Sequence, residues 1–126
     1  MTEKYYGHPK FYEMVEEEAE LHSCKNRDYT RGGDPLGNFK RVSAVLKIWG
    51  FDVPPEVVAL IYMMKQLDAT MWMLSQKYEG EVETIDSRLA DVSVYAKLAR
   101  ILKSEALTEE KDYLWVMQED IASQLP

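Results

Sequence analysis

The sequence predicts an all-α protein, a four-helix-type bundle with an added C-terminal helix, in a single domain over residues 1–126. Apolar residues recur at helical spacing along most of the chain, and no segment alternates between apolar and polar residues as a strand would. The chain is also 46% hydrophobic. That is enough for a packed core and far from the composition of a disordered chain.

The first helix is expected over residues 10–24, where apolar residues return at helical spacing and Pro9 stands at a tolerated position near the start. A long loop, Lys25–Gly37, should follow, because it contains two adjacent glycines, a proline and two aspartates. Long loops in compact domains are often functional. This loop is therefore a candidate for binding.

We expect the remaining helices over residues 38–50, 55–77 and 85–104, with a final one starting at residue 108. Asn38 could cap the first of these, and Gly80 is the expected stop after the second. The helices expected over residues 55–77 and 85–104 are apolar over much of their circumference, as helices buried in a bundle or an interface are. A small chain cannot easily hide both, so we expect a homo-oligomer, either a dimer or a tetramer.

The formal net charge of -7 argues against nucleic acid or an anionic membrane as the main partner, because both require a basic surface. The single cysteine, Cys24, excludes an intramolecular disulfide. The first ten residues are polar and lack the apolar run of a signal peptide. The longest apolar run, Val57–Met64, is too short to span a bilayer. A cytoplasmic location is the default expectation.

Asp91 is the strongest candidate for chemistry. Its helical neighbours toward the C-terminus are Val94, Tyr95 and Leu98, and a lone charge on an apolar helix face is costly unless something offsets it. A divalent metal held between helices would do so, and buried carboxylates cluster at working sites. The alternative is a structural aspartate bonded to a tyrosine, a serine or a lysine.

Asp68 stands in similar surroundings on the third predicted helix, with Ile61, Met64 and Met71 on neighbouring turns and Lys65 three residues before it. One interpretation gives Asp68 to a metal and Lys65 to a phosphate. The other is an ion pair between these two residues at the rim of the core.

Glu17 and Glu20 share a helix face because they are three residues apart, and they form a second acidic candidate. A charge run is usually a solvated face, and the helical wheel turns Glu18 inward, with His22 four residues on. A hydrogen-bonded Glu18–His22 pair is the more ordinary reading, since no histidine or cysteine cluster supports zinc. Hard oxygen ligands favour Mg²⁺ or Mn²⁺.

Polar and basic residues of the predicted loop, among them Lys25, Asp28 and Asn38, could bind a triphosphate beside such a metal. The alternative is a set of ordinary surface lysines. Gly32-Gly-Asp-Pro lacks the spacing and the lysine of a phosphate-binding P-loop.

Two segments resemble a known family. Glu17-Glu-Ala-Glu20 and Arg88-Leu-Ala-Asp91-Val-Ser-Val-Tyr95 look like the two acidic helices of the all-α nucleoside triphosphate pyrophosphatases, the MazG and dimeric dUTPase group. The closer resemblance is to small MazG-like proteins of bacteriophages, over about residues 8–102. It rests on the order of short motifs: Glu20-Leu-His22, Lys25-Asn-Arg-Asp-Tyr29, Asp34-Pro35, Asn38-Phe39, Lys65-Gln-Leu-Asp68 and Asp91-Val-Ser-Val-Tyr95.

The resemblance implies a helical bundle that binds Mg²⁺ and cleaves a nucleoside triphosphate to the monophosphate and pyrophosphate, in the host cytoplasm if the protein is phage-encoded. The metal ligands that it implies are Glu17, Glu20, Asp68, Asp86 and Asp91. Glu17 or Glu20 would also act as the general base. The alternative is a non-catalytic helical protein that binds a nucleotide or a host factor.

Two of the positions taken from the resemblance allow another interpretation. Asp86 has a structural alternative as the N-cap of its helix. Arg88 stands where the family usually has a glutamate, and an arginine there could hold a phosphate, as Lys25 and Lys65 would for the leaving pyrophosphate.

Overall fold

The computed structural model describes residues 5–30 and 33–124 of the chain, with all side chains in these ranges except those of residues 29, 111–116 and 121. The helices are α1 (Pro9–Thr30), α2 (Gly37–Ile48), α3 (Pro55–Ser75) and α4 (Ile85–Ser123). No strand occurs in the described ranges, so the all-α prediction is confirmed.

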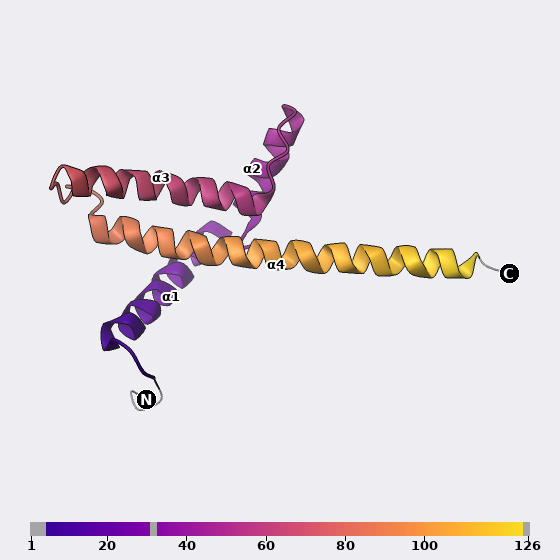
Figure 1. The fold of residues 1–126 in the computed structure, drawn as a ribbon, viewed down its shortest axis with the longest axis horizontal. Coiled ribbons are helices and arrows are strands. Elements are labelled where there is room, and N and C mark those ends of the chain that lie inside the picture. Colours follow the sequence, from indigo (N-terminus) through magenta and orange to yellow (C-terminus); the bar gives the residue numbers. More distant parts are fainter. Residues whose placement is uncertain (1–4, 31–32, 125–126) are drawn as a thin grey trace.

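The helices form an open arrangement (Figure 1). α3 and α4 lie side by side as an antiparallel pair, α2 packs against one end of α3, and α1 meets α4 over a short stretch. The C-terminal half of α4 extends well beyond the other helices. The contacts among the described helices do not confirm the four-helix-type bundle, and that part of the fold stays a prediction.

α1 is longer than the sequence predicted, because residues 25–30 continue the helix instead of opening the loop. Side chains reinforce this last stretch: Asn26 Nδ2 donates to the His22 carbonyl at 2.9 Å, and Thr30 Oγ1 donates to the Asn26 carbonyl at 2.7 Å. Nothing in these residues breaks a helix, and the glycines come only afterwards. The extra turns carry Lys25 and Asn26 toward α2.

α2 and α3 both end through a residue with positive φ, as in the Schellman motif. Gly50 has φ +88°, and the Phe51 N–H reaches back to the Leu46 carbonyl at 2.9 Å. At the end of α3 the same position is taken by Lys77, with φ +54°, and the Tyr78 N–H bonds to the Met73 carbonyl at 3.0 Å. The expectation that Gly80 stops α3 is therefore wrong by three residues.

α4 is one continuous helix of 39 residues, so the separate C-terminal helix predicted from Thr108 does not exist. The Thr108 hydroxyl does not cap a new helix. It donates back to the Ser104 carbonyl at 3.1 Å, one turn earlier. Residues 104–108 contain neither glycine nor proline, and without such a residue nothing interrupts the helix.

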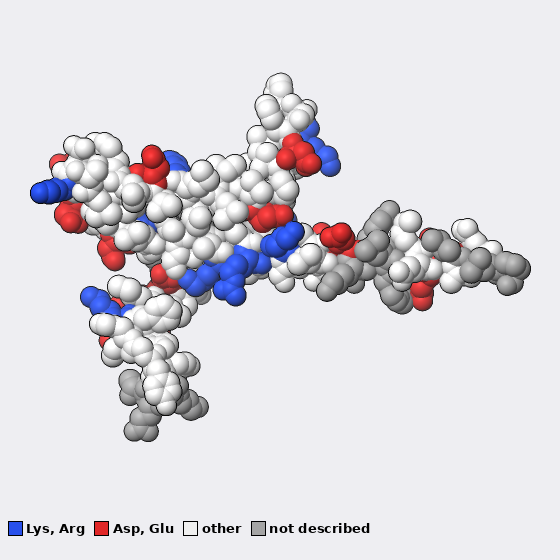
Figure 2. Space-filling view, viewed as in Figure 1, with Lys and Arg blue, Asp and Glu red and all other residues white. Residues whose placement is uncertain are grey.

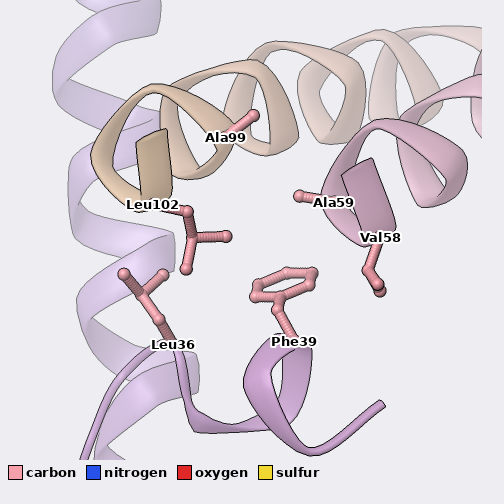
Figure 3. Packing of buried hydrophobic residues seen from close by; sticks show 6 residues of the cluster. All are labelled: Leu36, Phe39, Val58, Ala59, Ala99 and Leu102. Carbon is pink, nitrogen blue, oxygen red and sulfur yellow. The ribbon is translucent and has the colours of Figure 1, made fainter. Parts of the chain in front are cut away.

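The core lies where α2, α3 and α4 meet (Figure 3). Its buried members are Leu36, Phe39, Val58, Ala59, Ala99 and Leu102. The Phe39 ring packs against Tyr62 and Tyr95, with ring centroids 5.7 and 6.2 Å away. Offset and edge contacts of this kind add to the gain from burial. The three rings fix the start of α2 against the paired helices.

α3 carries two apolar faces. Val58, Ala59 and Met73 are buried on the inner face, while large apolar side chains such as Met64, Met71 and Trp72 are exposed on the outer face. Among the described residues, α3 is also the one helix long and apolar enough to cross a membrane, with a mean hydropathy of 1.2 over its most apolar stretch. Among the residues that the structure describes, no helix covers the outer face.

Candidate functional site

A cleft of about 540 Å³ opens between α1, the start of α2 and the first half of α4. Pockets of this size are typical for small molecules and cofactors. The side chains around it include three carboxylates, three groups that carry or can carry positive charge, two amides and two aromatic rings. The carboxylates are Glu18, Asp34 and Asp91, and the positive groups are His22, Lys25 and Arg41. The amides are Asn26 and Asn38, and the rings are Phe39 and Tyr95.

Asp91 lies in the wall that α4 contributes to this cleft and is half-buried, as its apolar neighbours predicted. Its Oδ2 accepts a hydrogen bond of 3.1 Å from Gln66 Nε2 on α3. The structural alternative named a tyrosine, a serine or a lysine as partner, so the glutamine was not foreseen. One amide donor does not neutralise a carboxylate, and the acid remains available to a cation in the cleft.

Arg88 lies on the far side of Gln66 from Asp91. Its Nη1 donates to Gln66 Oε1 at 2.7 Å, and its Nη2 lies 3.3 Å from the Glu83 carboxylate. Among the described residues its Nε is buried without a hydrogen-bond partner. Arg88 lines a smaller depression near the α3–α4 turn rather than the main cleft. The residue at the family's glutamate position is thus tied to Asp91 through a glutamine and does not reach the cleft itself.

Glu18 anchors α1 to α4. Its Oε2 accepts hydrogen bonds from Ser93 Oγ at 2.9 Å and from Lys97 Nζ at 3.0 Å, and its side chain is 19% exposed. The wheel that turned Glu18 and His22 inward is confirmed, since both line the cleft. The expected bond between these two residues is replaced by one from Asn26 Nδ2, 3.1 Å from His22 Nδ1.

Glu17 and Glu20 are exposed and lie outside the cleft-lining residues. They sit on either side of Glu18 along a helix that turns 100° per residue, so the face that brings Glu18 to α4 turns them toward solvent. The structure does not bring them together with Asp91. Their role as metal ligands or bases stays a prediction from the family resemblance.

Asp68, Lys65 and Asp86 are also exposed and outside the cleft. Asp68 and Lys65 lie on the outer half of α3, whereas Gln66 between them turns inward to Asp91. Asp86 is in the first turn of α4, where an acidic residue favours the helix dipole. It is not the N-cap, because Thr84 Oγ1 accepts the Ser87 N–H at 3.1 Å.

The predicted binding residues of the loop divide into two groups. Lys25 and Asn38 line the cleft, while Asp28 is exposed and does not. The expectation that Asn38 caps α2 is wrong, since Asn38 lies inside the helix and the Asp34 carboxylate takes the Leu36 N–H at 2.9 Å. This leaves the Asn38 side chain free of a capping role at the cleft.

Asp34 and Asn26 were not among the residues predicted for the site. Asp34 Oδ2 pairs with Lys40 Nζ at 2.6 Å, and this bond, with the Leu36 N–H, holds the pKa of Asp34 below its ordinary value of 3.8. Asp34 lies just before the start of α2, and Arg41 lies in its first half. Asp34-Pro35 had been identified only as one of the short motifs of the family resemblance. Asn26 became visible only because α1 continues past residue 24.

Basic side chains gather along the middle of α4, where α1 passes it (Figure 2). Lys97, which holds Glu18, belongs to this stretch of the helix. A chain of net charge -7 therefore presents local positive charge on the face of α4 seen in Figure 2. This is the sign of field that attracts a phosphate-bearing ligand.

No group of three or more histidine, cysteine, aspartate or glutamate side chains is close enough to hold a metal in the described ranges. The carboxylates of the cleft thus do not form a closed, all-protein metal cage. Mg²⁺ does not require one, since it is usually held by one or two carboxylates together with the phosphates of a substrate.

Comparison of the chain with known protein families, curated proteins and solved structures finds no match. The resemblance to the all-α pyrophosphatases consequently rests on the short motifs alone.

Proposed function

We propose that the protein is a Mg²⁺-dependent (Mn²⁺ serving as substitute) nucleoside triphosphate pyrophosphohydrolase, which converts a (d)NTP and water to the monophosphate and pyrophosphate. The observation that carries the proposal is the cleft between α1 and α4, where Asp91 shares one space with Lys25, Arg41 and two amides. A triphosphate with its metal ion requires this mixture of acid, base and neutral hydrogen-bonding groups.

The carboxylates that fit a metal are Asp91 and Glu18, which come from the two facing helices. Hard oxygen donors of this kind suit Mg²⁺ or Mn²⁺. When bound, the ion would neutralise and orient the phosphates. This assignment keeps Asp91 from the predicted ligand set and replaces Glu17 and Glu20 with the glutamate between them.

Lys25 and Arg41 are the groups that would contact the phosphate oxygens, because they bring positive charge to the cleft from α1 and α2. Asn26 and Asn38 offer both donors and acceptors to the edge of a base. Tyr95 adds an aromatic surface against which a base can pack.

His22 is placed to donate a hydrogen bond to a phosphate oxygen. It lines the cleft one turn after Glu18, and its Nδ1 accepts from the Asn26 amide at 3.1 Å. With Nδ1 accepting, the neutral ring carries its proton on Nε2 and can donate it to a ligand in the cleft.

The alternative is a nucleotide-binding protein without catalysis. The absence of a three-ligand acidic group in the described ranges favours it. So does Arg88, which occupies the family's second glutamate position and is engaged with Gln66 and Glu83. The same cleft would then bind the nucleotide and leave it intact.

The deciding experiment incubates the protein with each NTP and dNTP in Mg²⁺ and measures pyrophosphate release. Asp91→Asn should lower the rate at least about a hundredfold, as loss of one charge-stabilising group commonly does. Asp120→Asn, exposed on the same helix and outside the cleft, should keep the rate. Helical circular dichroism checks the fold of both variants.

Three results would contradict the proposal or change its details. No pyrophosphate from any nucleotide, with no heat on titration of Mg²⁺ and nucleotide, excludes the enzyme. Binding heat without pyrophosphate supports the alternative. Loss of activity in Glu17→Gln or Glu20→Gln, but not in Glu18→Gln, restores the ligand set predicted from the sequence.

A further inference from the structure

α3 carries a row of apolar side chains on its outer face with the spacing of a helix–helix seam. The row, called the outer seam below, consists of Val57, Leu60, Met64, Leu67, Met71 and Leu74. These residues repeat at intervals of three and four, the a and d spacing of a heptad. Each of their side chains is between 38% and 63% exposed.

The outer seam is not part of the internal packing of the chain. The residues that α3 buries, Val58, Ala59, Thr70 and Met73, lie on the opposite side of the helix. An ordinary surface helix carries one apolar stripe, and a second stripe of a/d spacing over three heptads indicates a second helix as partner.

The whole chain has more surface than a compact monomer can account for. It exposes 10561 Å², whereas a compact protein of its mass, 14.6 kDa, exposes about 6,900 Å². The excess is several times the roughly 800 Å² that each partner buries in a standard stable interface. The chain therefore has enough exposed surface for a standard interface with another chain.

We propose that the outer seam is the interface of a homodimer in which α3 packs antiparallel against α3 of a second copy. A two-fold axis through the midpoint of the seam places Val57 opposite the second copy's Leu74, Leu60 opposite its Met71, and Met64 opposite its Leu67. Every seam residue then meets an apolar partner, because the row is complementary to itself when reversed.

Charge favours the antiparallel direction. Asp68 is exposed at the e position beside the seam, and Lys65 is exposed on the same side at the b position behind it. In an antiparallel pair this side faces its own equivalent, so the long Lys65 side chain can reach toward the second copy's Asp68, which lies about 3 Å away along the axis. In a parallel pair this side would face the side of Met63 and Thr70, where the two charges find no partner. The same charges argue against a membrane, since they would lie near its midplane.

The first test measures the mass of the full-length protein by sedimentation equilibrium at micromolar concentration. We expect twice the chain mass. Leu67→Glu should raise the dimer dissociation constant at least about a hundredfold, because the two-fold axis buries two unpaired carboxylates. Leu89→Glu is the matched control, since Leu89 is 45% exposed on α4 against 40% for Leu67, and should leave the dimer intact.

The second test fixes the direction with cysteines in a Cys24→Ser background, which leaves no other thiol. Leu60→Cys and Met71→Cys chains should form an interchain disulfide when mixed, and neither should do so alone. Disulfides in each variant alone would show a parallel pair and overturn the proposed geometry.

Further outcomes decide between the occupants of the seam. A monomer at all concentrations, or a dimer that Leu67→Glu and Leu89→Glu affect equally, overturns the proposal. So does wild-type protein that remains monomeric and co-sediments with phosphatidylcholine–phosphatidylglycerol vesicles, which would make the seam a membrane contact. Lys65→Asp should weaken the dimer, and its combination with Asp68→Lys should restore it.

Discussion

α2 and α1 reach the α3–α4 pair by different kinds of contact. α2 inserts Phe39, which is 2% exposed, into the aromatic cluster with Tyr62 and Tyr95. α1 leaves its apolar residues largely exposed, with Phe11 at 62%, and is held to α4 through Glu18. One wall of the cleft is thus fixed by packing, and the other rests on polar bonds that a ligand can exchange.

Phe39→Ala should have the largest effect, because it removes the side chain that packs α2 against both long helices. Large-to-small changes of a buried phenylalanine cost about 3–5 kcal/mol in the free energy of unfolding. Urea denaturation followed by circular dichroism measures this quantity. If the loss were as small as that of a surface change, the apolar anchoring of α2 would be refuted.

Val45→Ala supplies the control for this change. Val45 lies in the same helix but is 53% exposed, so its truncation should alter the free energy of unfolding by less than about 0.5 kcal/mol. The difference between the two variants isolates the buried contact from the helix propensity of alanine.

Glu18→Ala should have a smaller and more local effect, since it removes the acceptor shared by Ser93 and Lys97. Lys97 is half-exposed, so solvent screening keeps the loss to about 1–2 kcal/mol. Because the bond joins α1 to α4, the loss should appear as faster trypsin cleavage at Lys25 and Arg27 in α1, with little change in global unfolding.

Glu17→Ala tests whether the faster trypsin cleavage comes from losing the bond between Glu18 and α4 or from losing one negative charge on α1. Glu17 is exposed one residue away, and its removal should leave the rate of trypsin cleavage unchanged. Equal acceleration in both variants would mean that charge on α1, and not its bond to α4, sets the opening of the helix.

The helical class and the inward turn of Asp91 and Glu18 could be predicted because apolar spacing within one helix decides them. Helix ends were less predictable. The length of α1 depends on side-chain bonds from Asn26 and Thr30, and the continuity of α4 depends on which carbonyl the Thr108 hydroxyl finds. When a polar side chain has several possible hydrogen-bond partners, the sequence alone does not indicate which one it binds.

The composition of the site was harder to predict, because it depends on which helices face one another. Gln66 was expected only as a spacer between Lys65 and Asp68, yet it is the residue of that group that reaches Asp91. A family motif fixes the order of residues and not the side of the helix that meets the site. Helix rotation of 100° per residue is enough to exchange the partners.

Lys77→Gly should change the stability of the core formed by α2, α3 and α4 without affecting α1. Lys77 ends α3 at φ +54°, a left-handed conformation that is strained for a residue with a side chain and relaxed for glycine. We expect a gain of about 0.5–1 kcal/mol, reduced from the full strain by the greater freedom of glycine in the unfolded chain. Thermal denaturation should show it, with trypsin cleavage of α1 unchanged.

The smallest effect is expected at the boundary between the two regions, where Asp34 lines the cleft and Leu36 enters the core. The hydrogen bond from Lys40 is the main cause that lowers the pKa of Asp34 from 3.8, followed by the Leu36 N–H. A lowered pKa contributes stability that is present above pH 3.8 and is lost as the pH falls through the folded-state value.

The Leu36 amide reports this titration directly, because its N–H donates to Asp34 Oδ1 at 2.9 Å. Its NMR shift should therefore change with a midpoint below pH 3.8, and Lys40→Met should move the midpoint upward. Lys47→Met, later in α2, should leave it in place. Were Lys40→Met to leave the midpoint unmoved, the Lys40–Asp34 bond would not form in solution, and the turn before α2 would depend on the Leu36 N–H bond to Asp34 and on the burial of Leu36.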